Sequence, residues 1–328
     1  ENDYYKEYQK SYFALTTKKG GWDCLRHYEI ILNGCIPYFP IIEKCPENTL
    51  FLFNNEFDID EKSSRKHIKH CASTKGISAI TVNGHSSEVH ACSFEEQKRI
   101  LNFSLDEVGD ITHVINGVYA DGSIEAAKIA KMSEENGASA LLCFPPQSMS
   151  MGGHLRPEMA IEHFKRIADS TDLPLICFNY PSAGNLTYPF ETLLKLFDSV
   201  PTIKAIKDWS NDPMLHEKHI RTFQNLSNPI NVLTTHSSWL MSSLVMGANG
   251  LLSGAGSVIA DLQVSLFNAV KNKDLSSAQE INNKIFPLVQ AFYSPPFLDM
   301  HNRMKETLVL MGLMDKAIVR PPLMKLSD

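Results

Sequence analysis

Short apolar runs alternate with amphipathic stretches from about residue 49 to the end of the chain, and this alternation constrains the fold most strongly. Parallel strands cannot be joined by a hairpin, so strands that alternate with helices predict a parallel sheet with helical crossovers. Eight candidate strands, all before residue 254, fit a closed (β/α)8 barrel better than an open doubly wound sheet. They are residues 49–53, 77–83, 112–118, 138–144, 175–179, 203–207, 231–235 and 250–253.

The pattern divides the chain into three segments. Residues 49–258 are expected to form the barrel. Residues 259–328 hold three helical patterns more than a barrel needs, so we expect a C-terminal helical appendix that packs on the barrel or on a neighbouring subunit. Residues 1–48 differ in character and are too few to enclose a core, so we expect an N-terminal extension and not an independent domain.

Composition limits the classes of partner, the cofactors and the cellular location that the sequence predicts. The 328 residues include 31 Lys+Arg and 37 Asp+Glu, a formal charge of −6, which argues against nucleic acid or an anionic membrane surface as a partner. No apolar run approaches the ~20 residues that span a bilayer. Seven scattered cysteines without a C-x-x-C pair argue against a disulfide framework and a structural zinc site. Because the start also lacks a signal-peptide pattern, we expect a cytoplasmic protein without a metal.

The most informative single segment is I-K-A-I-K-D at residues 203–208. Side chains alternate along a strand, so Ala205 and Lys207 share one face and Lys204 lies on the other. A Lys207 that points into the lumen at the carboxyl end of its strand lies where such barrels place catalytic groups. Desolvation would then lower its pKa, and the neutral amine could form a Schiff base with a carbonyl. The alternative is a strand-end lysine that reaches solvent or pairs with Asp208.

Three motifs, taken together, resemble those of a known family. N-G-H-S-S-E at 83–88 resembles its G-[ST]-T-G-E loop, F-N-Y-P at 178–181 its Y-N-x-P motif, and I-K-D at 206–208 its I-K-[ED] motif. From about residue 57 to 326 the chain resembles the dihydrodipicolinate synthase / N-acetylneuraminate lyase family of class I aldolases and dehydratases. The resemblance implies a Schiff-base lyase for a pyruvate-type or sugar-derived 2-oxo acid, with Lys207 as nucleophile and no cofactor. It also implies a homotetramer or a homodimer.

The loop after the second predicted strand holds the next candidates. By resemblance, Ser86 and Ser87 belong to a cradle for the carboxylate of the 2-oxo acid, since hydrogen bonds to an anion are strong. The alternative is a polar turn that only holds a strand–helix junction. His85 stands where the family has a hydroxyl residue, and it either shuttles a proton or merely orders the loop.

Two later segments are expected at the same mouth of the barrel. Ser253 and Gly254 follow the eighth predicted strand, where barrels often bind phosphate, and the resemblance suggests a glycine-lined wall near the lysine. A plain turn is the alternative there. His236 ends the seventh predicted strand and is a candidate for contact with substrate.

Departures from the family pattern are equally informative. Phe178 stands where the family has a proton-relaying tyrosine, so it is expected only to wall the pocket, and Tyr180 is a candidate replacement. Gln147 matches a second family tyrosine, and Ala183 matches the arginine that binds the second substrate in dihydrodipicolinate synthase. These residues argue against that synthase activity. They also leave open a catalytically impaired barrel that serves as a binding or assembly module.

The N-terminal segment carries a second resemblance. The runs K-K-G-G-W-D, R-H-Y-E and G-C-I-P give residues 11–55 a likeness to a fragment of an exostosin-like GT-B glycosyltransferase. A fusion that retains sugar-nucleotide binding is therefore a further alternative, although the segment is only a fraction of one nucleotide-binding domain. Residues 49–53 either supply the first barrel strand or are foreign sequence in its place.

Overall fold

The computed structural model describes residues 13–15, 36–38 and 57–326. The chain divides into two units, Glu1–Asp58 and Ile59–Asp328. In the first, β1 (Phe13–Leu15) pairs in parallel with β2 (Ile36–Tyr38). The candidate first barrel strand at 49–53 and most of the segment that resembles a glycosyltransferase lie outside the described residues, so both stay predictions.

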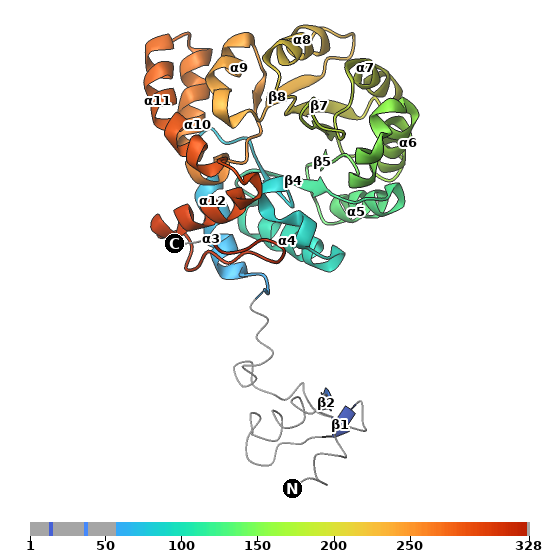
Figure 1. Cartoon of the computed structure of the whole chain (residues 1–328), viewed down its shortest axis with the longest axis vertical. Coiled ribbons are helices and arrows are strands. Elements are labelled where there is room, and N and C mark those ends of the chain that lie inside the picture. Colours follow the sequence, from blue (N-terminus) through green and yellow to red (C-terminus); the bar gives the residue numbers. More distant parts are fainter. Residues whose placement is uncertain (1–12, 16–35, 39–56, 327–328) are drawn as a thin grey trace. The chain divides into compact units, whose positions relative to one another are not determined.

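The second unit is built around a curled parallel sheet of the (β/α)8 class, ringed by helices (Figure 1). Seven strands of this sheet lie in the described part of the chain, and they neighbour one another in chain order. Every one overlaps a predicted strand, which confirms the predicted fold class. The strands are β3 (Ala79–Val82), β4 (His113–Val118), β5 (Ala140–Cys143), β6 (Leu175–Asn179), β7 (Ile203–Asp208), β8 (Asn231–Thr234) and β9 (Gly250–Leu251).

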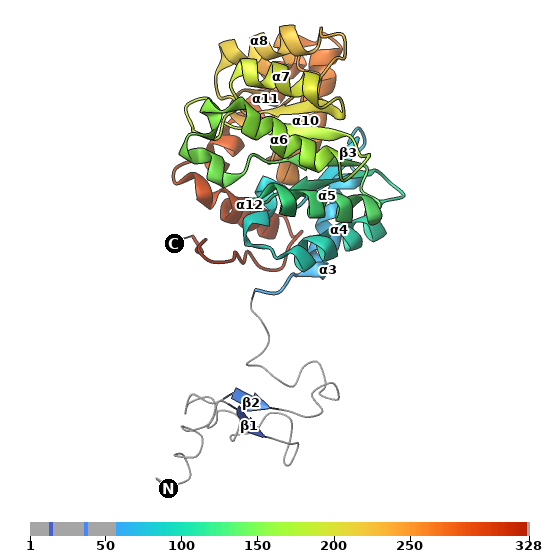
Figure 2. The same ribbon diagram turned by 90° about the vertical axis from the view of Figure 1, so that its right-hand side faces the viewer.

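Helices join the strands on the outside, and α4 to α8 follow one another in order along one side of the sheet (Figure 2). A capping box starts α4, where Ser93 N donates to Glu96 Oε2 at 2.8 Å. No described helix has the length and apolar character needed to cross a membrane. The connecting helices are α3 (Glu61–Ala72), α4 (Phe94–Val108), α5 (Ser123–Glu135), α6 (Pro157–Ala168), α7 (Phe190–Ser199), α8 (Pro213–Phe223) and α9 (Leu240–Met246).

The predicted C-terminal appendix is present. It comprises α10 (Gly256–Lys271), α11 (Leu275–Phe292) and α12 (Met300–Leu310), with the 3-10 turn η8 (Phe297–Asp299) before α12. These helices share an apolar core that includes Leu266, Ile285 and Met304. The appendix therefore brings side chains from the last part of the chain to the mouth of the barrel.

Two apolar layers alternate along the strands. On β6, Leu175 and Cys177 belong to the outer core between sheet and helices, whereas Phe178 belongs to the core inside the sheet. Ala205 of β7 lies in this inner core, and Lys207 follows two residues later, in register with Phe178. The predicted alternation on this strand therefore directs Lys207 into the lumen.

Candidate active site

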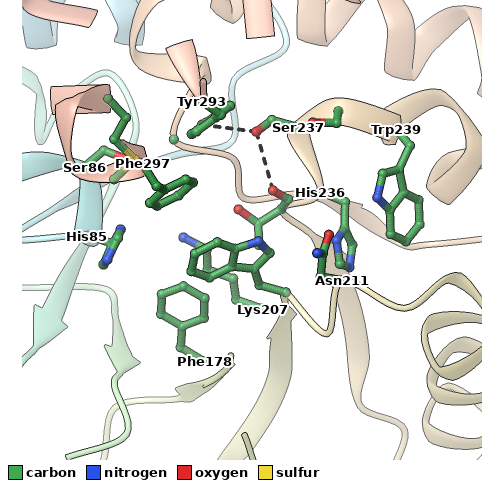
Figure 3. A pocket seen from close by; sticks show the side chains of 15 residues that line it. His85, Ser86, Phe178, Lys207, Asn211, His236, Ser237, Trp239, Tyr293 and Phe297 are labelled. Atoms are coloured by element: carbon green, nitrogen blue, oxygen red, sulfur yellow. Dashed lines mark hydrogen bonds between the residues drawn. The ribbon is translucent and has the colours of Figure 1, made fainter. Parts of the chain in front are cut away.

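A cavity of about 240 Å³ opens where the strands end, the end at which barrels of this class carry their sites (Figure 3). Six of the predicted site residues line it: His85, Ser86, Phe178, Lys207, His236 and Gly254. The other lining residues are Trp209, Asn211, Thr235, Ser237, Ser238, Trp239, Tyr293, Phe297 and Met300. Loops after four strands and the appendix thus meet at one place.

Lys207 lies at the inner end of this cavity. Its side chain is only 5% exposed, and its Nζ lies 4.2 Å from the ring centroid of Phe178. Among the described residues it has no hydrogen bond or ion pair. Desolvation by burial lowers the pKa of Lys207 to about 7, because the charged amine loses water and gains no countercharge. A substantial fraction of this amine is therefore neutral near neutral pH.

His85 opens the 3-10 turn η3 (His85–Ser87), and aromatic rings surround it. Its ring centroid lies 6.0 Å from that of Trp209, 6.4 Å from Phe178 and 6.5 Å from Phe297. Burial, and then the nearby charge of Lys207, lower the pKa of His85 to about 3, so its imidazole is neutral. His301 of α12 bonds through Nε2 to the His85 carbonyl at 2.8 Å and ties the appendix to this loop.

The two serines after His85 have different surroundings. Ser86 lines the cavity and lies so close to Gly254 that a Cβ at residue 254 would overlap the Ser86 Oγ. Position 254 therefore has no room for a side chain. Ser87 is exposed, and its Oγ accepts a hydrogen bond from Gly84 N at 3.2 Å, so its hydroxyl serves the turn.

A chain of hydroxyl groups runs along the appendix side of the cavity. The Ser237 hydroxyl bonds to Tyr293 OH at 3.1 Å, as Figure 3 shows, and to Ser253 Oγ at 2.9 Å. Gln263 Nε2 donates to Ser253 Oγ at 3.1 Å. Ser253 thus stands behind the wall of the cavity and orders Ser237, while Tyr293 and Ser237 face the cavity.

Two other predicted residues lie away from the cavity surface. Tyr180 is buried behind Phe178, with ring centroids 4.7 Å apart, and burial raises the pKa of its phenol. Gln147 is exposed at the start of η5 (Gln147–Met151), where its backbone N donates to Asp121 Oδ1 at 2.8 Å. Neither residue lines the cavity in this arrangement, and their predicted roles stay predictions.

Beside the cavity lies a buried polar cluster around Asp208, the residue after Lys207. His216 Nδ1 and His219 Nδ1 donate to Asp208 Oδ2 at 2.7 and 2.8 Å, and Ser210 N donates to Oδ1 at 2.9 Å. Burial alone would raise the pKa of Asp208, but the hydrogen bonds from the two histidines lower it below the usual range. The carboxylate is therefore a stable buried anion.

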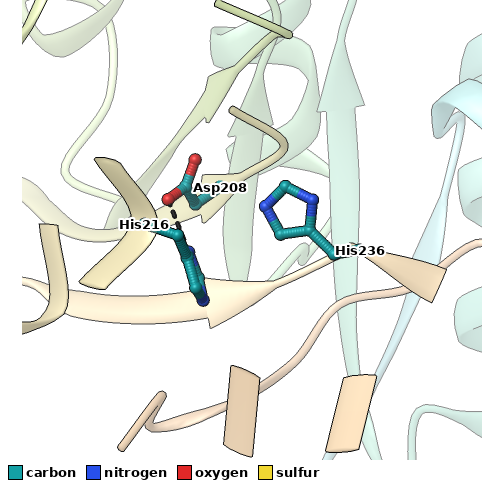
Figure 4. A group of neighbouring side chains, drawn as sticks. All are labelled: Asp208, His216 and His236. Carbon is teal, nitrogen blue, oxygen red and sulfur yellow. Dashed lines mark hydrogen bonds and ion pairs between the residues drawn. The ribbon is translucent and has the colours of Figure 1, made fainter. Parts of the chain in front are cut away.

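This cluster is also where a metal ion could be held in the described part of the chain. Ligand atoms of Asp208, His216 and His236 lie within 4.8 Å of one another (Figure 4). Both oxygens of the carboxylate already accept hydrogen bonds, whereas Nε2 of His216 and both ring nitrogens of His236 have no partner among the described residues. The expected absence of a metal remains a prediction here.

Sequence reasoning missed several lining residues. Trp209 and Asn211 follow the I-K-D motif directly, and Trp239 follows His236 by three residues, so their place at strand ends was a usable signal. Tyr293 and Phe297 come from the appendix, and nothing in their local sequence points to the barrel mouth.

Comparisons with known proteins agree with the fold described above. The model of the dihydrodipicolinate synthetase family matches residues 48–328. A 4-hydroxy-tetrahydrodipicolinate synthase from Helicobacter pylori is 26% identical over 250 residues, which cover 74% of this chain and 80% of that protein. The structure of YagE from E. coli K12 with pyruvate has a TM-score of 0.76 at 22% identity and covers 83% of this chain and 89% of that one. A dihydrodipicolinate synthase from Acinetobacter baumannii with pyruvate has a TM-score of 0.72 at 25% identity, with 82% and 88% covered.

Proposed function

The chain belongs to the dihydrodipicolinate synthetase family, and from this premise we propose that it is a Schiff-base lyase, an aldolase or dehydratase, for a 2-oxo acid. The observation that carries the proposal is the Lys207 amine, which is buried, unpaired among the described residues and directed into a cavity at the strand ends. Two structures of similar fold contain pyruvate, which supports a pyruvate-type substrate.

The proposed chemistry follows from the state of this amine. Its neutral form attacks the C2 carbonyl of the 2-oxo acid, water leaves, and an iminium forms at Lys207. The positive iminium accepts the electron pair of a bond broken two atoms away. Ser86 would hold the carboxylate, the hydroxyl of Ser87 would hold the turn that positions it, and Phe178 would pack against the methylene side of the adduct. Because the carbon–nitrogen bond is covalent, no cofactor is required.

Reductive trapping tests this proposal. Sodium borohydride with pyruvate should add the mass of reduced pyruvate at Lys207, located by peptide mass spectrometry of the full chain. Lys207→Ala should abolish the adduct. Lys204→Ala is the matched control, because this exposed lysine lies three residues earlier on the same strand. The proposal fails if neither pyruvate nor any other 2-oxo acid gives an adduct at Lys207.

We do not extend the proposal to the synthase activity of the Helicobacter relative. Phe178, Gln147 and Ala183 stand where the family's two tyrosines and arginine are expected, and Ala183 is exposed outside the cavity. The same residues favour a second candidate function, a catalytically impaired barrel that serves as a binding or assembly module. Phe178→Tyr separates the two candidates: if only this variant has retro-aldol activity, the natural chain is impaired.

Two properties complete the proposal. The described cysteines Cys71, Cys92, Cys143 and Cys177 are free, which supports a reducing cytoplasmic location.

The family resemblance suggests a homotetramer or homodimer, which light scattering of the purified chain would identify. Binding of a nucleotide sugar to the full chain would instead support the fusion alternative.

A further inference from the structure

The cavity wall beyond Lys207 is made of stacked aromatic rings. Trp209 stacks on Phe297 with centroids 5.3 Å apart, and Phe297 stacks on Tyr293 at 5.6 Å. Phe297 and Tyr293 lie on one side of Lys207 in Figure 3, and His236 lies on the other, flat against Trp239 at 3.9 Å. Such walls favour a flat ligand, because aromatic pairs gain stacking energy in addition to buried area.

Charge in this cavity is confined to its inner end. Of the described residues that line it, Lys207 alone is a Lys, Arg, Asp or Glu. The positive iminium that forms at Lys207 is balanced by the carboxylate of the 2-oxo acid itself. A second anionic group on the ligand would then lose its water without meeting a countercharge, which is costly. The part of the substrate beyond the 2-oxo acid is therefore expected to be uncharged.

Several polar side chains line the cavity, but the hydroxyls of Ser237 and Tyr293 are engaged with each other. Asn211 and Ser238 are exposed at the rim, and the Ser237 hydroxyl is already bonded to its neighbours. A polyhydroxylated chain would have to compete with the hydrogen bonds that these hydroxyls already make. His236 is the exception, because it is 2% exposed and neither ring nitrogen has a partner in the described part of the chain.

His236 suits a single neutral oxygen. A neutral imidazole offers one N–H donor and one acceptor nitrogen, and both nitrogens of His236 are buried and without a partner among the described residues. Its plane is fixed by the Trp239 stack. A carbonyl or hydroxyl group fits this pair of functions, whereas a carboxylate gains nothing from the acceptor nitrogen.

We infer that the partner of the 2-oxo acid in this cavity is an uncharged aromatic aldehyde, so that the chain cleaves or forms 4-aryl-4-hydroxy-2-oxo acids. The inference rests on the proposed function and names its substrate class. In cleavage, the C3–C4 bond of the Lys207 iminium breaks and its electron pair forms the enamine. The C4 hydroxyl, held by His236, loses its proton to water at the cavity mouth as the aldehyde forms. C3 then takes a proton from water, and hydrolysis releases pyruvate and the free amine.

The test compares three aldehydes in the addition of pyruvate by the full chain. Benzaldehyde is aromatic and uncharged, D-glyceraldehyde is an uncharged polyol, and succinic semialdehyde is an anion. We expect kcat/KM for benzaldehyde to exceed that for each of the others at least tenfold. A chain that traps pyruvate on Lys207 but does not turn over benzaldehyde, or that prefers another of the three, contradicts the inference and leaves the proposed function intact.

A variant pair tests the aromatic wall itself. Phe297→Leu removes one ring of the stack at a partly exposed position, so the fold should tolerate it, and the preference for benzaldehyde should fall at least fivefold. Phe286→Leu is the matched control, because Phe286 is an exposed phenylalanine of α11 that does not line the cavity. Equal effects of the two substitutions, or an unchanged preference in Phe297→Leu, would overturn the assignment.

Discussion

Two consecutive residues of β7 place a charged group in the interior in opposite ways. Lys207 points into the lumen, where Phe178 and the cavity surround its amine and no described residue pairs with it. Asp208 points toward α8, where two histidines and a backbone N–H donate to its carboxylate. Burial therefore favours the neutral form of Lys207. The carboxylate of Asp208 is also buried, but the hydrogen bonds that it accepts keep it ionised.

The two surroundings suit different roles: that of Lys207 suits a reactive group, and that of Asp208 suits a group that holds the structure in place. An uncompensated amine lowers stability but is ready to attack a carbonyl. A carboxylate that accepts three hydrogen bonds from its own chain serves to anchor α8 to the strand that carries Lys207. Substitutions at the two neighbours should therefore have opposite effects on the free energy of unfolding.

The largest effect is expected at Asp208. Asp208→Ala leaves His216, His219 and the Ser210 N–H without their acceptor inside the protein, and breaking such a buried network costs about 3–5 kcal/mol. Urea denaturation followed by circular dichroism measures the loss. Asp198→Ala, at an exposed position of α7, should change the free energy by less than ~0.5 kcal/mol. A loss at Asp208 no larger than this control would refute the anchoring role.

Lys207 should show the reverse effect, with a characteristic pH dependence. Its pKa is lowered from 10.5 to about 7, so the unfolded chain binds a proton between these pH values that the folded chain does not. Stability from this group is therefore lowest below pH 7 and rises as the pH approaches 10.5.

Lys207→Met removes this penalty, so the variant should be more stable than the natural chain at pH 7. Its advantage should shrink by about 2 kcal/mol between pH 7 and pH 9, at 1.36 kcal/mol per unit of pKa shift weighted by protonation. Paired denaturation curves at the two pH values test this, since all other groups cancel in the difference. An advantage that is constant with pH would mean that the amine is not desolvated.

The inward direction of Lys207 was predictable because strand alternation is local: one residue separates it from Ala205, which lies on the inner face. The partners of Asp208 were not. His216 and His219 are three residues apart, which predicts a common helix face, but the sequence does not say which buried group that face meets. The buried group that this helix face meets depends on how α8 packs on β7, and that packing is determined by contacts throughout the core.

The same limit explains the cavity wall. His85, Ser86 and Gly254 follow strands, and the barrel pattern alone brings the ends of strands to one mouth. Tyr293 and Phe297 reach that mouth from the appendix, through packing that no motif encodes. Ser87 shows that a motif can place a residue in the right loop without fixing which way its hydroxyl points.

The smallest predicted effect concerns reactivity and asks whether the contrast between the neighbours persists in solution. Only the neutral amine reacts with acetic anhydride, and with a pKa of about 7 the neutral fraction of Lys207 rises about tenfold between pH 6 and pH 8. Trace labelling should follow this rise and then level off by pH 9, because the amine is then almost fully neutral. Lys204, exposed on the same strand, is read from the same peptide digest as the solvent-exposed reference. If the two lysines gave parallel profiles, the amine would be as hydrated as its neighbour, and the cavity would lose the property that separates it from the compensated carboxylate next to it.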